Sequence, residues 1–205
     1  MNLEEYKGVY VFAEQVDNKL SGIAFELLGK AKDLAADLNA EVAAVLIGSD
    51  VKGLADELAA YGADKVTVVD DPELKEYRTE PYAHALASVI EKYKPEIMLV
   101  GATAIGRDLG PRVSARVQTG LTADCTQLEI GDFPINPVAG KEQKHNQLLM
   151  TRPAFGGNTI ATIACPDNRP QMATVRPGVM QKIAKIEGAK ANVEEFNPGF
   201  TPDNK

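Results

Sequence analysis

The sequence is poor in the residues that build metal centres and covalent cross-links. It has two cysteines and two histidines among 205 residues. Cys125 and Cys165 lie in separate apolar, strand-like segments, and no CxxC pair is present. His84 and His145 lie in unrelated surroundings. Because zinc sites need clustered ligands and disulfide frameworks need more cysteines, we expect two buried, reduced thiols and no metal site.

The chain also lacks long apolar runs and an excess of positive charge. No apolar segment approaches the ~20 residues that a membrane-spanning helix needs, and Met1–Tyr6 is acidic without the apolar core of a signal peptide. The net charge is −7, which disfavours binding to a nucleic-acid backbone. Arg107, Arg112 and Arg116 form only a local group. We expect a cytoplasmic protein, or one of the mitochondrial matrix in a eukaryote, that binds neither membranes nor nucleic acid.

Strand-like and helix-like patterns alternate through the first half of the chain. Hydrophobic residues make up 44% of the sequence, enough for a substantial core. The strand-like segments are nearly continuous apolar runs, as strands covered on both faces should be. This alternation predicts a doubly wound parallel sheet of Rossmann-like α/β architecture. The expected strands are 8–13, 41–47, 65–69 and 96–100, and the expected helices are 23–38, 51–61, 80–93 and 107–118.

After residue 120 the helical patterns stop. Four strand-like segments, at 123–130, 147–152, 159–165 and 171–176, predict an antiparallel extension built on the parallel sheet. The polar stretch 131–146 between the first two is expected to be the tip of a long hairpin. Beyond Gly178 the sequence becomes polar with little periodicity, and we divide the chain into an α/β domain at 1–188 and a linker at 189–205.

The first candidate site is the stretch Gly101–Arg112, which follows an apolar strand and opens a helix. Helix N-termini at the carboxyl ends of parallel strands bind anions, and glycine allows close approach to the backbone. The stretch matches neither glycine-rich phosphate fingerprint, so a tight turn chosen for backbone freedom is an equal explanation. Arg107 and Asp108 are expected to open the helix, where Asp108 suits the helix dipole and Arg107 needs a partner.

The second candidate site is Thr151–Asn158, which places a cation, an aromatic ring and two glycines beside an apolar strand. Pro153 forces an extended backbone at Arg152. A guanidinium there is suited to an anionic ring or a flavin N5 edge, although a plain hairpin turn explains the same residues. The candidate cofactor-binding residues are Arg152, Pro153, Phe155, Gly156, Gly157 and Asn158. We find no nucleophile paired with a base, so no catalytic residue is predicted.

Five segments in order give the chain a resemblance to the α subunit of electron transfer flavoproteins. They are Gly8–Glu14 (GVYVFAE), Leu99–Arg112 (LVGATAIGRDLGPR), Thr119–Cys125 (TGLTADC), Thr151–Asn158 (TRPAFGGN) and Cys165–Pro177 (CPDNRPQMATVRP). The motifs GRDLGP and TGLTADCTQ resemble those of the electron-bifurcating members of anaerobes more than those of the mitochondrial members.

The resemblance implies a heterodimer with a β subunit that takes electrons from dehydrogenases and passes them on through FAD. In the bifurcating members electrons come from NADH and go to ferredoxin or flavodoxin and to an acyl-CoA dehydrogenase. The family's C-terminal FAD-binding domain has no counterpart in this sequence, so 189–205 is interpreted as the linker toward it, and the chain by itself is not expected to be a catalyst. The resemblance places Arg152 near a second FAD held mainly by the β subunit.

Two other functions stay open at this stage. The parallel α/β pattern is also that of the adenine-nucleotide α-hydrolase-like proteins, so an adenine-nucleotide binding module of the universal-stress or ATP-pyrophosphatase type is an alternative. Direct ATP binding would favour it. A purely structural interaction domain, with Arg152 far from any flavin, is the other.

Overall fold

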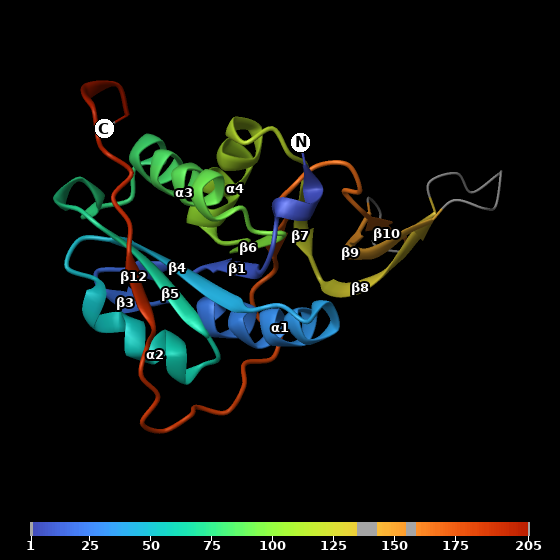
Figure 1. Ribbon diagram of the computed structural model, residues 1–205, viewed down its shortest axis with the longest axis horizontal. Helices are drawn as coiled ribbons and strands as arrows, with labels where there is room; N and C mark the ends of the chain where they lie inside the picture. The colour runs from blue at the N-terminus through green and yellow to red at the C-terminus, as the bar shows by residue number, and fades with distance from the viewer. Residues whose placement is uncertain (1, 135–142, 155–158, 205) are drawn as a thin grey trace.

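The computed structural model describes residues 2–134, 143–154 and 159–204. A parallel sheet of seven strands forms the centre, in the order β12-β5-β4-β1-β6-β11-β7 (Figure 1). The doubly wound α/β fold predicted from the alternating pattern is confirmed. The strands are β1 Val9–Phe12, β4 Val42–Gly48, β5 Lys65–Asp70, β6 Ile97–Gly101, β7 Leu121–Cys125, β11 Gln171–Val175 and β12 Val193–Glu195.

Helices cover both faces of this sheet. Figure 1 shows α1 and α2 on one face and α3 and α4 on the other. Each face has its own buried apolar cluster, because residues alternate between the two faces along each strand. The helices are α1 Gly22–Leu38, α2 Ala55–Ala60, α3 Thr79–Tyr93 and α4 Ala104–Arg116, with short 3₁₀ turns at Leu3–Glu5, Lys52–Leu54, Pro72–Leu74 and Pro202–Asn204.

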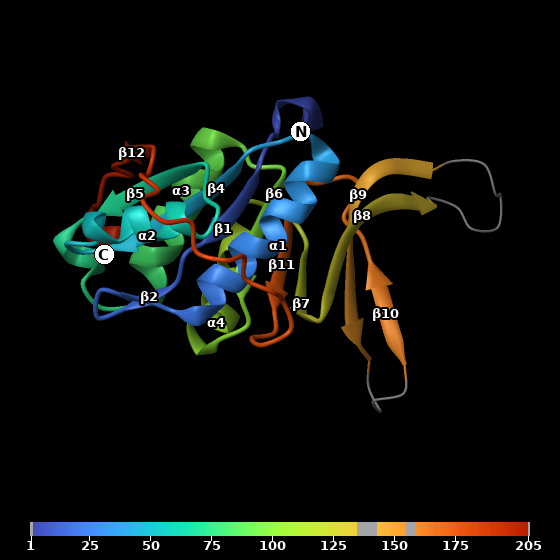
Figure 2. The ribbon, with the colours of Figure 1, turned by 90° about the horizontal axis from the view of Figure 1, so that it is seen from below.

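The strands after residue 120 divide between two sheets. The extension is a three-stranded antiparallel sheet in the order β10-β9-β8, made of β8 Gln127–Pro134, β9 Gln143–Pro153 and β10 Ile160–Ile163. It projects from the body in Figure 2, and we call it the arm. The antiparallel pairing of β8 with β9 confirms the predicted hairpin, whose tip at 135–142 lies outside the described residues.

The placement of 171–176 in the extension was wrong. The β11 strand, Gln171–Val175, is fully buried and lies between β6 and β7, parallel to both. The single strand expected at 123–130 is also two strands in the structure. The first, β7, belongs to the main sheet, and the second, β8, belongs to the arm. A small hairpin, β2 Gln15–Val16 with β3 Lys19–Leu20, was not predicted.

The polar C-terminal stretch packs against the body. The segment after β11 crosses below α1 and α2 in Figure 1, where the Ile186 N–H donates to the Ala60 carbonyl. The chain then pairs as β12 with β5, inside the range expected to be a linker. Glu194 of β12 accepts a hydrogen bond from Tyr93 and pairs with Lys65.

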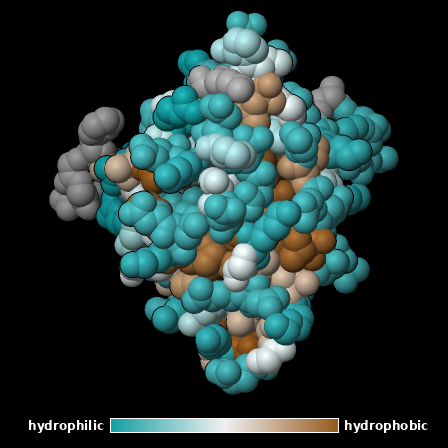
Figure 3. Space-filling model, turned by 90° about the vertical axis from the view of Figure 1, so that its left-hand side faces the viewer, coloured by the Kyte–Doolittle hydropathy of each residue, from teal (hydrophilic) through white to brown (hydrophobic). Residues whose placement is uncertain are grey.

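The surface away from the arm mixes hydrophilic and hydrophobic side chains. In the space-filling view of Figure 3, hydrophobic groups form small, separate spots among hydrophilic ones. No helix of the described residues is long and apolar enough to cross a membrane.

Candidate functional site

The carboxyl ends of β1 and β6 mark the point where the sheet's connections diverge, the usual ligand position in open α/β sheets. Here Thr103 is the N-cap of α4, and its hydroxyl oxygen accepts a hydrogen bond from the Gly106 N–H at 3.0 Å. The same hydroxyl donates to the carboxylate of Glu14, a buried residue that follows β1. The chain therefore places its own carboxylate where an anionic ligand would otherwise lie.

The glycines of the first candidate site are required for packing. A Cβ at Gly106 would lie 1.7 Å from the carbonyl oxygen of Gly101, and a Cβ at Gly101 would lie 2.7 Å from the Ile23 side chain. These contacts support the tight-turn interpretation of Gly101–Arg112. At both positions the helix and its neighbours approach too closely for any side chain larger than hydrogen.

The prediction that Arg107 and Asp108 open the helix was wrong. The helix α4 begins at Ala104, three residues before Arg107. The Arg107 Nε donates to the Ala102 carbonyl at 2.9 Å. The Asp108 carboxylate accepts hydrogen bonds from the hydroxyls of Thr79 and Tyr77, at 2.6 and 2.5 Å, and these lower the pKa of Asp108. Asp108 thus joins α4 to the start of α3.

An ion pair between Asp124 and Arg176 lies at the carboxyl ends of β7 and β11. Asp124 has a left-handed backbone, with φ of +60°. The Arg176 guanidinium donates from Nε and Nη2 to the two carboxylate oxygens, at 3.1 and 2.6 Å. These hydrogen bonds lower the pKa of Asp124, and the charges of Arg107 and Arg152 lower it further. Sequence reasoning missed this pair, because only the order of the strands brings the two residues together.

Arg152 lies near the end of β9, opposite Ala161 of β10. It has no hydrogen-bond or ion-pair partner among the residues that the structure describes. The side chain borders a hollow of about 310 Å³ whose described lining also includes Pro153, Ala154 and Ala161. The other candidate residues, Phe155, Gly156, Gly157 and Asn158, lie outside the described residues.

The positive charge of Arg152 acts on the nearby end of β7. It favours the ionised forms of Asp124 and of Cys125, although burial dominates at Cys125 and raises the pKa of its thiol to about 12. Cys125 is fully buried, Cys165 is half-buried, and both thiols are free. An accessible cation beside a small apolar wall is suited to the polar edge of a planar, electron-rich ring.

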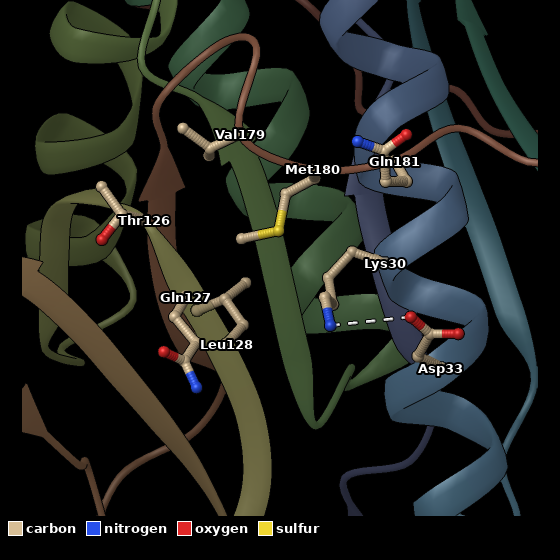
Figure 4. A pocket seen from close by; sticks show the side chains of 8 residues that line it. All are labelled: Lys30, Asp33, Thr126, Gln127, Leu128, Val179, Met180 and Gln181. Atoms are coloured by element: carbon tan, nitrogen blue, oxygen red, sulfur yellow. Dashed lines mark ion pairs between the residues drawn. The ribbon is translucent and has the colours of Figure 1, made fainter.

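A second hollow, of about 250 Å³, lies where α1, the start of β8 and the segment after β11 meet (Figure 4). Lys30 and Asp33 of α1 form an ion pair with each other at 3.6 Å. The opposite wall is formed by Leu128, Val179 and Met180. Its two charged side chains satisfy each other, and Thr126, Gln127 and Gln181 add uncharged polar groups to the lining.

Within the described ranges, no group of three or more histidine, cysteine, aspartate or glutamate side chains is arranged to hold a metal ion.

Comparisons with known proteins agree on one family. A family model described as the electron transfer flavoprotein domain matches residues 9–200. An "Electron transfer flavoprotein subunit alpha" of Megasphaera elsdenii is 54% identical over 195 residues, covering 95% of this chain and 54% of that protein. The chain spans about half the length of the curated relatives it matches.

Two other relatives carry names of dehydrogenase or reductase complexes. The "Acryloyl-CoA reductase electron transfer subunit beta" of Anaerotignum propionicum is 47% identical, covering 88% of this chain and 52% of that protein. The "Lactate dehydrogenase (NAD(+),ferredoxin) subunit LctC" of Acetobacterium woodii is 44% identical, covering 92% of this chain and 42% of that protein.

Proposed function

Because the chain belongs to the electron transfer flavoprotein family and matches its α subunits, we propose that it forms the N-terminal α/β domain of such a subunit. In this role it contacts a β subunit and contributes Arg152 to the surroundings of a flavin held between the two. The observation that carries the proposal is that Arg152, on the arm, has no hydrogen-bond or ion-pair partner in the described part of the chain and borders an open hollow.

The residues around Arg152 fit the edge of a flavin ring. Pro153, Ala154 and Ala161 offer a small apolar wall, and the guanidinium presents several N–H donors in a fixed plane. FAD, when bound, would supply one- and two-electron transfer. Arg152 would stabilise negative charge on the ring and raise its affinity for electrons. With no catalytic residue assigned, the chain is proposed to tune and position rather than to catalyse.

The partners proposed follow the names of the relatives. The Anaerotignum and Acetobacterium relatives are named for an acryloyl-CoA reductase and for an NAD- and ferredoxin-linked lactate dehydrogenase. We therefore propose bifurcation, with electrons from NADH passing to ferredoxin or flavodoxin and to an acyl-CoA dehydrogenase. We also propose that 1–188 forms the body of the domain, and that 189–205 adds β12 to its sheet before leading toward a C-terminal FAD-binding domain. The proposed location is cytoplasmic.

The adenine-nucleotide alternative has less support. The Glu14 carboxylate lies at the divergence point of the sheet, hydrogen-bonded to the cap of α4, and it would repel a phosphate there. ATP binding by the chain alone would nevertheless favour the adenine-nucleotide alternative at this end of the sheet.

The docking part is tested by co-purification with the β subunit of the same organism. Ile160 on the arm is 72% exposed, and Val16 on the β2–β3 hairpin is 53% exposed. Ile160→Glu should abolish or weaken the complex, and the matched variant Val16→Glu should leave it intact. Equal binding by both variants, or no complex with the wild-type chain, would contradict docking through the arm.

A further inference from the structure

Arg176 and Asp124 form an ion pair near Arg152, and Arg152 itself is not bonded to either of them. Arg176 engages both carboxylate oxygens of Asp124, while Arg152 has no partner among the described residues. The Thr126 N–H, two residues after Asp124, donates to the carbonyl of Thr151 at 2.9 Å, which places Arg152 beside the end of β7. The Arg152 charge accordingly reaches the Asp124 carboxylate. Arg152 therefore lies near an anion that another arginine already holds.

The backbone fixes this arrangement on both sides. The Asp124 N–H donates to the Thr174 hydroxyl at 2.9 Å, and the Arg176 N–H donates to the Cys125 carbonyl at 3.0 Å. The left-handed φ of Asp124 is uncommon outside glycine, asparagine and aspartate. Aspartate tolerates this conformation, and the two backbone hydrogen bonds hold it with the carboxylate directed to Arg176.

We propose that Arg176 is a positioning residue that holds Asp124 away from Arg152, and that the Asp124 charge sets how strong a positive field Arg152 presents to the flavin. The inference rests on the proposed function. Released from Arg176, the carboxylate would pair with Arg152, since two opposite charges at contact distance attract strongly near a protein surface. Arg152 would then lose both its charge effect and its free N–H donors.

The test uses the assembled flavoprotein and measures the reduction potential of the flavin near Arg152 by spectroelectrochemistry. Arg176→Gln should lower the potential, because freed Asp124 neutralises Arg152. Asp124→Asn should raise it, because a negative charge is removed. Asparagine suits the left-handed backbone at this position, so this variant should keep its fold.

The double variant separates positioning from simple loss of charge. Independent charge effects predict that Arg176→Gln lowers the potential by the same amount in the wild-type and Asp124→Asn backgrounds. If Arg176 acts by holding Asp124, Arg176→Gln should lower the potential much less in the Asp124→Asn background than in the wild type. Arg176→Lys keeps the charge but loses the two-point contact, so it should lie between wild type and Arg176→Gln. An equal lowering by Arg176→Gln in the wild-type and Asp124→Asn backgrounds would overturn the proposal.

Two further variants distinguish its failure from that of the proposed function. A potential unchanged by Arg152→Ala would remove the flavin role of Arg152 and this inference with it. A potential lowered by Arg152→Ala but unmoved by Asp124→Asn would leave the proposed function and refute the inference. Glu57→Gln is the matched control, since exposed Glu57 lies on α2, which packs against β5 toward the opposite edge of the sheet, and it should not change the potential.

Discussion

Replacing Gly106 with alanine tests whether the stretch after β6 is a packing turn. The new Cβ would lie 1.7 Å from the Gly101 carbonyl oxygen, whereas ordinary contacts begin at 3.4 Å. The start of α4 would have to move away from β6 by roughly 1.7 Å. Such overpacking costs about 1–3 kcal/mol, and the better helix propensity of alanine returns roughly 0.5–1 kcal/mol.

The expected net loss is about 1–2 kcal/mol in the free energy of unfolding. For a chain of this size each kcal/mol lowers Tm by ~2–4 °C. Urea unfolding followed by circular dichroism measures the first quantity and a thermal scan the second. Gly22→Ala is the control, because a Cβ there meets nothing within 4 Å, and it should change stability by less than ~0.5 kcal/mol. Equal stability of Gly106→Ala and the wild type would refute the packing argument.

Three other predictions follow from single contacts. Thr103→Val removes the side-chain cap of α4, so urea unfolding should show a loss of about 1 kcal/mol, and no loss would mean that the cap is replaced. The hydroxyl of Thr79, first among its partners, lowers the pKa of Asp108 below 3.8. The ionised Asp108 carboxylate therefore contributes fully to stability above its unfolded pKa of 3.8. This contribution is lost as pH falls through the lower pKa of Asp108 in the folded chain. Asp108→Asn should accordingly reduce the drop in Tm between about pH 5 and pH 3, and an unchanged drop would contradict the contact. Because Cys125 is buried with a pKa of about 12 and Cys165 is half-buried, mass spectrometry of the folded chain treated with a thiol reagent should find label on Cys165 before Cys125, and the reverse order would contradict the packing.

The elements with strong local patterns were predictable. The apolar runs of β1, β4, β5 and β6 and the helical spacing of α1 and α3 each identify their element without help from the rest of the chain. The start of α4 was also readable in principle, because Thr103 is a good N-cap residue three positions before Gly106. The predicted start at Arg107 was three residues too late.

The strands that depend on distant partners were not predictable in the same way. The β11 strand is buried on both faces and carries no alternation, which is typical of a central parallel strand. That signal was available, but its place between β6 and β7 was not. The β12 strand is short, polar and mostly exposed, so only its pairing with β5 defines it.

In the candidate site, too, residues with a local sequence signal were predictable and residues joined across the sheet were not. Arg152 was identified from its neighbours in sequence, since Pro153 fixes the backbone beside it. Asp124 and Arg176 are joined across the sheet, and no local pattern links them. Glu194 is another such case, because its partners Lys65 and Tyr93 come from other elements.

Hydrogen–deuterium exchange of the chain with and without its β subunit tests the central claim most directly. If the arm docks the β subunit, amides of 143–153 and 160–163 should exchange more slowly in the complex. Amides of α2, Ala55–Ala60, and of the β2–β3 hairpin at 15–20 should keep their rates. Unchanged exchange in the arm, with protection elsewhere on the chain, would contradict both the docking surface and the flavin-facing role of Arg152.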